Sequence, residues 1–92
     1  MDDDLRIPEG IEAQTHKVFD NLKRALAGAG AGLEHVVQVR IFLTDFARDY
    51  AAMNRIYQTY FPPGRLPART TVGVTALARG GVIEIDLIAR KP

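Results

Sequence analysis

The sequence predicts a two-layer α+β sandwich, in which two helices cover one face of a β-sheet. Two long segments, 11–29 and 46–60, carry apolar residues at the three- and four-residue spacing of amphipathic helices. Three shorter segments, 35–43, 70–77 and 82–89, alternate in the two-residue period of strands. Glycine and proline separate these segments, so the expected order is helix, strand, helix, strand, strand.

The first predicted helix begins at Ile11 and ends in a glycine-rich stretch. Its apolar stripe consists of Ile11, Thr15, Val18, Phe19, Leu22, Ala25, Leu26 and Ala29. Glycine favours helix ends, so we expect Gly28, Gly30 and Gly32 to stop this helix. Residues 1–10 are expected to form a loose arm, with the acidic run at its start in solvent.

The second helix and the first strand follow from the next two patterns. In the strand, alternation predicts one face from Val37, Val39, Ile41 and Leu43, and the other from Val36, Gln38, Arg40 and Phe42. Thr44 and Asp45 then supply a cap for a helix that ends before Phe61-Pro62-Pro63-Gly64.

The last two strands are predicted to form an antiparallel hairpin. The turn would be Ala78–Gly81, whose glycines can adopt positive φ. One face of the first strand would hold Val72, Val74 and Ala76, and the other Thr71, Gly73 and Thr75.

The second face of this predicted sheet mixes apolar and charged residues. It would carry Val36, Phe42, Val82 and Ile88 among Gln38, Arg40, Thr71, Glu84 and Asp86. A monomer would leave the apolar members of this face in water, so the pattern favours subunit packing in a closed oligomer.

Composition excludes several functional classes. The chain has 92 residues, no cysteine and a net charge of +1 from 12 basic and 11 acidic residues. A disulfide framework and a thiolate metal site are therefore excluded, and no strong attraction to nucleic acid or to a membrane is expected. No segment resembles a signal peptide or a membrane span, which favours a cytoplasmic protein.

Arg69 and Glu84 are the first candidates for chemistry. A guanidinium is always charged and offers a planar fork to a carboxylate or phosphate, whereas a carboxyl group with a raised pKa can exchange protons with water. Two interpretations remain open: Arg69 is a surface charge and Glu84 an oligomer-facing polar residue, or both belong to a site. In the predicted hairpin, Glu84 would lie nearer Thr75 than Arg69, so direct contact within one chain is not expected.

Other polar and aromatic residues give weaker signals. His16 and His35 are separated and lack further ligands at metal-binding spacing, so no metal site is expected. Asn54 lies inside a helix, where asparagine is unfavourable, which leaves open a specific hydrogen bond or a solvent-facing side chain. The tyrosines of that helix, Tyr50, Tyr57 and Tyr60, have helical spacing and are expected in the core or an interface.

Four stretches together resemble the RidA/YjgF family of imine deaminases. They are Gln14 with Asn21-Leu22 in the first helix, Asn54-x-x-Tyr57 in the second, Pro67-Ala68-Arg69, and Ile83-Glu84-Ile85. The resemblance implies a chorismate-mutase-like fold and a homotrimer with its sheets inside and its active sites between subunits. It also implies a single domain over residues 1–92 that is short at its N-terminus, because family members usually begin with additional strands.

The resemblance further implies roles for individual residues. Arg69 would hold the carboxylate of a 2-imino acid, backbone groups around Thr71 would assist, and Glu84 would position the attacking water. Asn54 would be structural rather than catalytic, and no cofactor would be required. The cysteine that the family often carries near the arginine is replaced by Thr71.

Three functions remain to be compared. The first is hydrolytic deamination of enamines and imines by a trimer. The second is a non-catalytic trimer of the same family that binds small carboxylates or regulates another protein. The third is RNA binding or cleavage, which the near-neutral charge disfavours.

Overall fold

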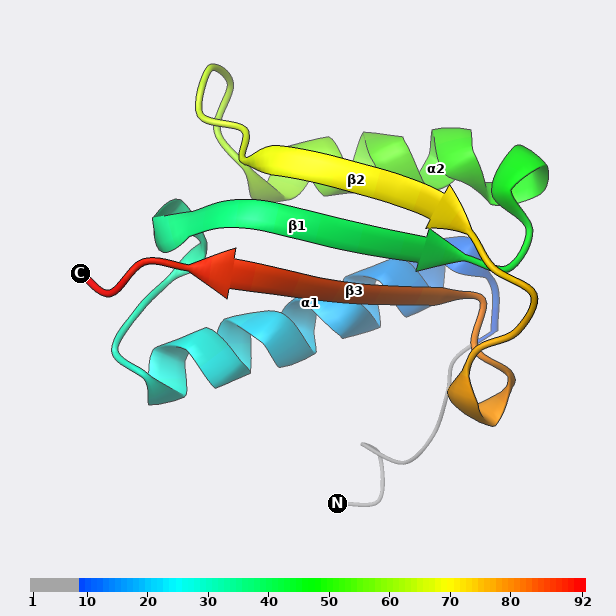
Figure 1. The fold of residues 1–92 in the computed structure, drawn as a ribbon, viewed down its shortest axis with the longest axis horizontal. Helices are drawn as coiled ribbons and strands as arrows, with labels where there is room; N and C mark the ends of the chain where they lie inside the picture. The colour runs from blue at the N-terminus through cyan, green and yellow to red at the C-terminus, as the bar shows by residue number, and fades with distance from the viewer. Residues whose placement is uncertain (1–8) are drawn as a thin grey trace.

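The computed structural model describes residues 9–92, which fold into helices on one side of a mixed sheet. The elements are α1 (Ile11–Gly28), β1 (Val36–Leu43), α2 (Phe46–Tyr60), β2 (Ala68–Gly73) and β3 (Ile83–Ala89), with short 3-10 turns at Leu33–His35 and Ala78–Gly80. Both α-helices lie behind the strands in Figure 1. The predicted two-layer α+β sandwich is therefore confirmed. The predicted arm falls mainly on residues 1–8, outside the described part of the chain.

Local signals account for the helix ends. Gly10 precedes α1 with φ of 90°, and Gly30 follows it with φ of 75°, a backbone region that favours glycine. The Asp45 carboxylate accepts a hydrogen bond from the backbone N–H of Arg48 at 3.2 Å and so caps α2. Both helices lie close to the predicted ranges because caps and breakers act locally.

The core lies between the two layers. Its members from the helices are Phe19, Leu26, Met53 and Tyr57, and its members from the strands are Val36, Val39, Ile41, Leu43, Ile83 and Ile85, with Phe61 after α2. Removing this apolar surface from water is the main force that holds the helices on the sheet.

The predicted hairpin is wrong. The strand order is β2-β1-β3, with β1 parallel to β2 and antiparallel to β3. Figure 1 shows the chain leaving β2, passing the end of β1 and returning as β3 on its other side. Residues 74–82 form this connection, so the alternation in 74–77 belongs to a crossing loop and not to a strand. Alternation alone does not specify a strand's neighbour.

The orientation of β2 also differs from the prediction. Thr71 pairs with the buried Ile41, and Gly73 pairs with Leu43, so these residues face the helices. Thr71 had been expected on the opposite face. A Cβ added at Gly73 would lie 3.5 Å from Cβ of Phe46, which shows how closely α2 approaches β2 here. Small or polar side chains fit this interface, whereas Val72 faces away and is 38% exposed.

The predicted faces of β1 are wrong at its first two residues, because the strand contains a β-bulge there. The pairing with β3 shifts between Val36 and Gln38. Val36 consequently turns into the core, and Val37, which was expected there, is 44% exposed. A bulge inserts one unpaired residue and reverses the alternation beyond it.

The sheet surface opposite the helices is called the open face. It contains Gln38, Arg40, Phe42, Thr70, Val72, Glu84, Asp86 and Ile88. Ile88 is 59% exposed, so apolar surface remains on this face as predicted. Within residues 9–92, no helix is long and apolar enough to cross a membrane.

Candidate functional site around Arg69

Arg69 extends from β2 toward α2 and is half-buried there. Its Nη1 donates to Asn54 Oδ1 at 2.6 Å, and its Nη2 donates to the Tyr50 hydroxyl at 2.9 Å. The guanidinium carbon also lies 4.7 Å from the centre of the Tyr57 ring. We call this group of Arg69, Tyr50, Asn54 and Tyr57 the Arg69 clamp.

The clamp exists because α2 repeats about every 3.6 residues. Tyr50, Asn54 and Tyr57 follow one another at intervals of four and three residues and therefore share one side of the helix. Arg69 faces that side because it pairs with Val39, whose side chain is in the core. Of the two interpretations of Asn54, the structure shows the specific hydrogen bond.

The charge of Arg69 is not neutralised by an acid among residues 9–92. Its recorded partners there are an amide, a phenol and aromatic rings, all of them neutral. A guanidinium has five N–H donors, and two are used in the clamp, so three remain. A positive group with this many remaining donors can bind an anion, and a planar carboxylate fits its fork.

Two buried hydroxyl groups lie between α2 and the sheet, one on Tyr57 of α2 and one on Thr71 of β2. Tyr57 Oη and Thr71 Oγ1 have no hydrogen-bond partner among the described residues. Burial raises the pKa of the Tyr57 phenol, and the positive charge of Arg69 partly opposes that shift. The phenol thus remains protonated at neutral pH, and buried polar groups of this kind commonly bind water or a ligand.

Glu84 lies apart from the Arg69 clamp in a single chain. It pairs with Phe42 on the open face and is exposed, whereas Arg69 pairs with Val39 on the helix-facing side. The two residues come from strands on opposite sides of β1 and point to opposite faces of the sheet. As expected, they do not meet within one chain, although the reason is the strand order and not a hairpin register.

Sequence reasoning missed the contacts of Tyr50 and Tyr57 with Arg69, one through a hydroxyl and the other through a ring face. Their spacing predicted only a core or interface location. The available signal was their position on the same helical side as Asn54, an asparagine that needed a partner. Which strand would supply that partner could not be inferred from a pattern in α2.

The two histidines form hydrogen bonds with groups outside the Arg69 clamp. His16 Nδ1 lies 2.6 Å from the Tyr60 hydroxyl, and His35 Nδ1 accepts from the Gly32 N–H at 3.0 Å. Within residues 9–92, no group of three or more His, Cys, Asp or Glu side chains could hold a metal ion.

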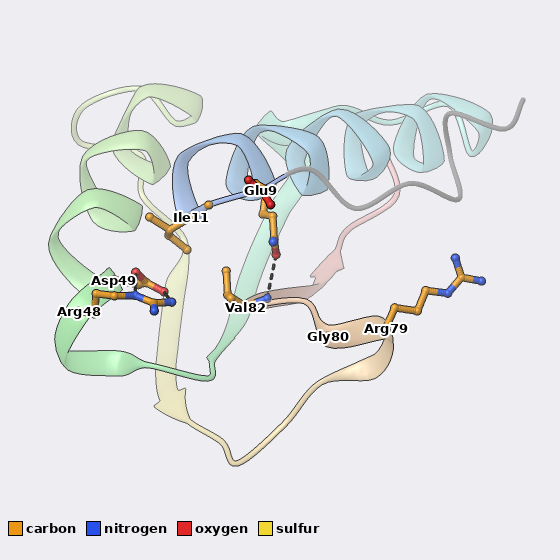
Figure 2. Close-up of a pocket in the computed structure, with 9 residues that line it drawn as sticks. Glu9, Ile11, Arg48, Asp49, Arg79, Gly80 and Val82 are labelled. Carbon is orange, nitrogen blue, oxygen red and sulfur yellow. Dashed lines mark hydrogen bonds and ion pairs between the residues drawn. The ribbon is translucent and has the colours of Figure 1, made fainter.

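A pocket lies where α1 begins, shown in Figure 2. Here Gln14 Oε1 accepts from the Val82 N–H at 2.8 Å, and Arg48 donates to both carboxylate oxygens of Asp49 at 2.8 and 2.9 Å. The Arg79 side chain points away from Arg48 in Figure 2. The Gln14–Val82 hydrogen bond joins α1 to the segment before β3, whereas the Arg48–Asp49 pair lies within α2.

On the open face, Arg40 is paired with Asp86. Its Nε and Nη2 donate to the two carboxylate oxygens at 2.9 and 2.7 Å. These hydrogen bonds are the main reason that the pKa of Asp86 is lowered. The guanidinium also lies 5.7 Å from the centre of the Phe42 ring. Unlike Arg69, Arg40 is therefore already paired with a carboxylate of the same sheet.

Comparison with known proteins identifies the family. A sequence profile described as "Endoribonuclease L-PSP" matches residues 1–91. The chain belongs to this family, the RidA/YjgF family. Its predicted resemblance to that family is confirmed.

Relatives in the RidA/YjgF family include proteins with assigned names. Protein DfrA of Myxococcus xanthus is 49% identical over 79 residues, which cover 86% of this chain and 59% of that protein. The mouse 2-iminobutanoate/2-iminopropanoate deaminase is 39% identical over 83 residues, 90% of this chain and 60% of that enzyme. The chain thus spans less than two thirds of the length of either relative.

Solved structures of the family share the fold. RidA from Psychrobacter sp. PAMC 21119 superposes with a TM-score of 0.88 at 37% identity, covering 95% of this chain and 69% of that one. The YjgF gene product of E. coli superposes with a TM-score of 0.87 at 30% identity, covering 95% and 69%. The predicted RidA/YjgF-type, chorismate-mutase-like fold is thereby supported over the described elements.

Proposed function

We propose that this protein is a hydrolytic deaminase of reactive enamine and imine intermediates, converting a 2-imino acid and water into a 2-keto acid and ammonia. The observation that carries the proposal is the Arg69 clamp, which holds a cation against neutral partners and leaves three donors for a carboxylate. The name of the mouse relative, a 2-iminobutanoate/2-iminopropanoate deaminase, supports the choice of substrate class.

In this proposal, Arg69 binds the substrate carboxylate and Glu84 acts on water. The water oxygen adds to the carbon of the protonated C=N bond while Glu84 accepts one of the water protons, which gives a carbinolamine. Glu84 returns that proton to the nitrogen, the C–N bond breaks to release ammonia, and the remaining hydroxyl group gives up its proton to the departing ammonia as the C=O bond of the keto acid forms. Backbone groups around Thr71 assist in binding, Asn54 positions Arg69, and no cofactor takes part.

The proposal requires Arg69 and Glu84 from different subunits. In one chain they lie on opposite faces of the sheet, so one protomer cannot offer both to the same small substrate. A homotrimer assembled through the open face would bring Glu84 of each chain next to a second chain, whose edge strand β2 carries Arg69. The exposed Val72 and Ile88 on that face support such packing, because association would remove them from water.

The test is ammonia release from 2-iminobutanoate generated in situ from an amino acid. Wild type should exceed the buffer rate, and Arg69→Ala should lower kcat/KM about 10- to 100-fold, the usual worth of hydrogen bonds to a charged group. Glu84→Gln should lower kcat. Wild-type activity equal to buffer, or an unchanged rate in Arg69→Ala, would exclude this function.

Mixing the two variants tests the shared site. If Arg69 and Glu84 act in different subunits, mixed trimers of Arg69→Ala and Glu84→Gln contain some sites with both native residues. Activity should rise above that of either variant after the two impaired proteins are unfolded and refolded together. The mass in solution should be three times the 10.2 kDa chain. A monomer in solution, or no recovery in mixed trimers, contradicts the shared site.

A second candidate is a non-catalytic trimer that binds small carboxylates or regulates another protein. The separation of Glu84 from the Arg69 clamp within one chain favours it, because the anion anchor does not depend on Glu84. Calorimetric binding of 2-oxobutanoate without turnover of the imine would select this function.

The family description raises RNA as another substrate class. The net charge of +1 argues against it, because RNA binding depends on neutralising several phosphates. Salt-dependent RNA binding at micromolar protein concentration or below would favour RNA over imino acids as the substrate class.

A further inference from the structure

The Tyr50 hydroxyl has a donor capacity that the clamp does not use. Its oxygen accepts from Arg69 Nη2 at 2.9 Å, which leaves the phenolic O–H hydrogen free to donate. No acceptor for this hydrogen is recorded among residues 9–92. Tyr50 is half-buried, so a small ligand can reach its edge.

The Tyr50 ring is held in place from a second direction. Phe46 stacks on it with ring centres 5.0 Å apart and an angle of 17° between the planes. Phe46 in turn lies close to Gly73 of β2. The hydroxyl therefore has a defined position before any ligand arrives, which lowers the entropy cost of binding.

The Arg69 guanidinium is fixed on its other side. Asn54 accepts from Nη1, and the Tyr57 ring lies against the guanidinium face. These contacts restrict Arg69 to one arrangement, in which Nη2 stays next to the Tyr50 oxygen. Arg69 Nη2 and the Tyr50 hydroxyl oxygen are therefore held 2.9 Å apart, and each carries a further hydrogen that can be donated to a ligand.

We propose that the Tyr50 hydroxyl is a second donor to the anion held by Arg69, so that both groups bind one carboxylate of the ligand. This inference rests on the proposed role of Arg69 as a carboxylate anchor. A carboxylate has two oxygens, so one can accept from Arg69 Nη2 while the other accepts from the Tyr50 hydroxyl, each at the usual length of a charge-assisted hydrogen bond. A phenol that accepts from a guanidinium is also polarised toward donating.

Tyr50→Phe is the direct test, because it removes the hydroxyl and keeps the stacked ring. Calorimetry with 2-oxobutanoate should show a dissociation constant about tenfold higher, within the range for one hydrogen bond to a charged group. In imine hydrolysis, KM should rise by a similar factor while kcat stays within about twofold, because the contact persists from substrate to transition state.

Tyr60→Phe is the matched control. It removes a hydroxyl from the same helix, but that hydroxyl contacts His16 and not Arg69. Its dissociation constant for 2-oxobutanoate should equal that of wild type. A crystal structure of Tyr50→Phe should show Arg69 still bonded to Asn54, which separates loss of a donor from displacement of the arginine.

Three outcomes would overturn the inference. If Tyr50→Phe binds 2-oxobutanoate as wild type does while Arg69→Ala does not, Tyr50 is no donor, and the proposed function stands. If Tyr50→Phe displaces Arg69, Tyr50 serves only to position it. If wild type itself binds no 2-oxobutanoate, the carboxylate anchor fails first, and the role of Tyr50 fails with it.

Discussion

Arg48 belongs to the first turn of α2 and Arg69 reaches α2 from β2, and their partners differ in charge. Arg48 donates twice to Asp49, a carboxylate that is 2% exposed at the start of the helix. Arg69 donates to the neutral Asn54 and Tyr50 further along the helix. The first arginine neutralises a buried acid, whereas the second has no acidic partner among residues 9–92. In the proposed function, this difference leaves the charge of Arg69 for the ligand.

The largest predicted effect is on ligand affinity, which should fall when Arg69 is replaced but not when Arg48 is replaced. Arg69→Ala should weaken 2-oxobutanoate binding about 10- to 100-fold, because a charged pair is lost. Arg48→Ala should leave the dissociation constant within about twofold. Calorimetry on both variants measures this, and equal losses would show that the comparison between the arginines is wrong.

Asn54→Asp should convert the Arg69 clamp into a paired site like that of Arg48. The new carboxylate would accept from Arg69 Nη1 in place of the amide and neutralise the guanidinium. We expect about tenfold weaker 2-oxobutanoate binding with no loss of thermal stability. Asn54→Ala removes the contact without adding charge and serves as the control. If Asn54→Asp binds the ligand normally, the charge of Arg69 is not what the ligand recognises.

Arg48→Ala should reduce stability rather than binding. The Asp49 carboxylate would remain buried without its guanidinium, a costly arrangement that lowers the free energy of unfolding. The melting temperature should fall by a few degrees and recover in Arg48→Ala/Asp49→Ala, which removes both charges. A melting temperature equal to that of wild type would mean that water replaces the lost partner.

The smallest effect concerns the exposed pair on the open face. Hydrogen bonds from Arg40 lower the pKa of Asp86 below its usual value of 3.8. A carboxyl group with a lowered folded-state pKa contributes stability above its unfolded pKa and loses it as pH falls through the folded pKa. Asp86→Asn should therefore melt slightly below wild type at pH 7, and the difference should shrink as the pH falls through the lowered folded-state pKa of Asp86 and vanish below it. A difference that persists in acid would point to packing and not to charge.

The sequence was sufficient for the helices and much of the core because their signals are local. The stripe of α1, the Asp45 cap of α2 and the alternation in β3 each depend on neighbours within a few residues. The bulge at Val37 was not predicted, because positions 36 and 37 are both valine and the sequence does not show which of them lacks a partner on β3. The strand order was missed because a pattern does not name its partner strand.

The candidate site divides in the same way. Arg69 and Asn54 could be chosen from residue type and context, since a charge at a strand start and an amide inside a helix both need partners. The involvement of Tyr50 and Tyr57 required the pairing of β2 with β1, which turns Arg69 toward α2. Thr71 was placed on the wrong face for the same reason.

The amino-acid sequence by itself determined the order of elements, the helix ends, the apolar core of the helices and the family, because each depends on residue identity along the chain. Only the tertiary structure decided that β1 lies between β2 and β3, that Arg69 is held by neutral groups of α2, and that Glu84 points to the opposite face of the sheet. These features depend on contacts between segments far apart in the chain, where packing of the shared core selects one arrangement from several that the local patterns allow.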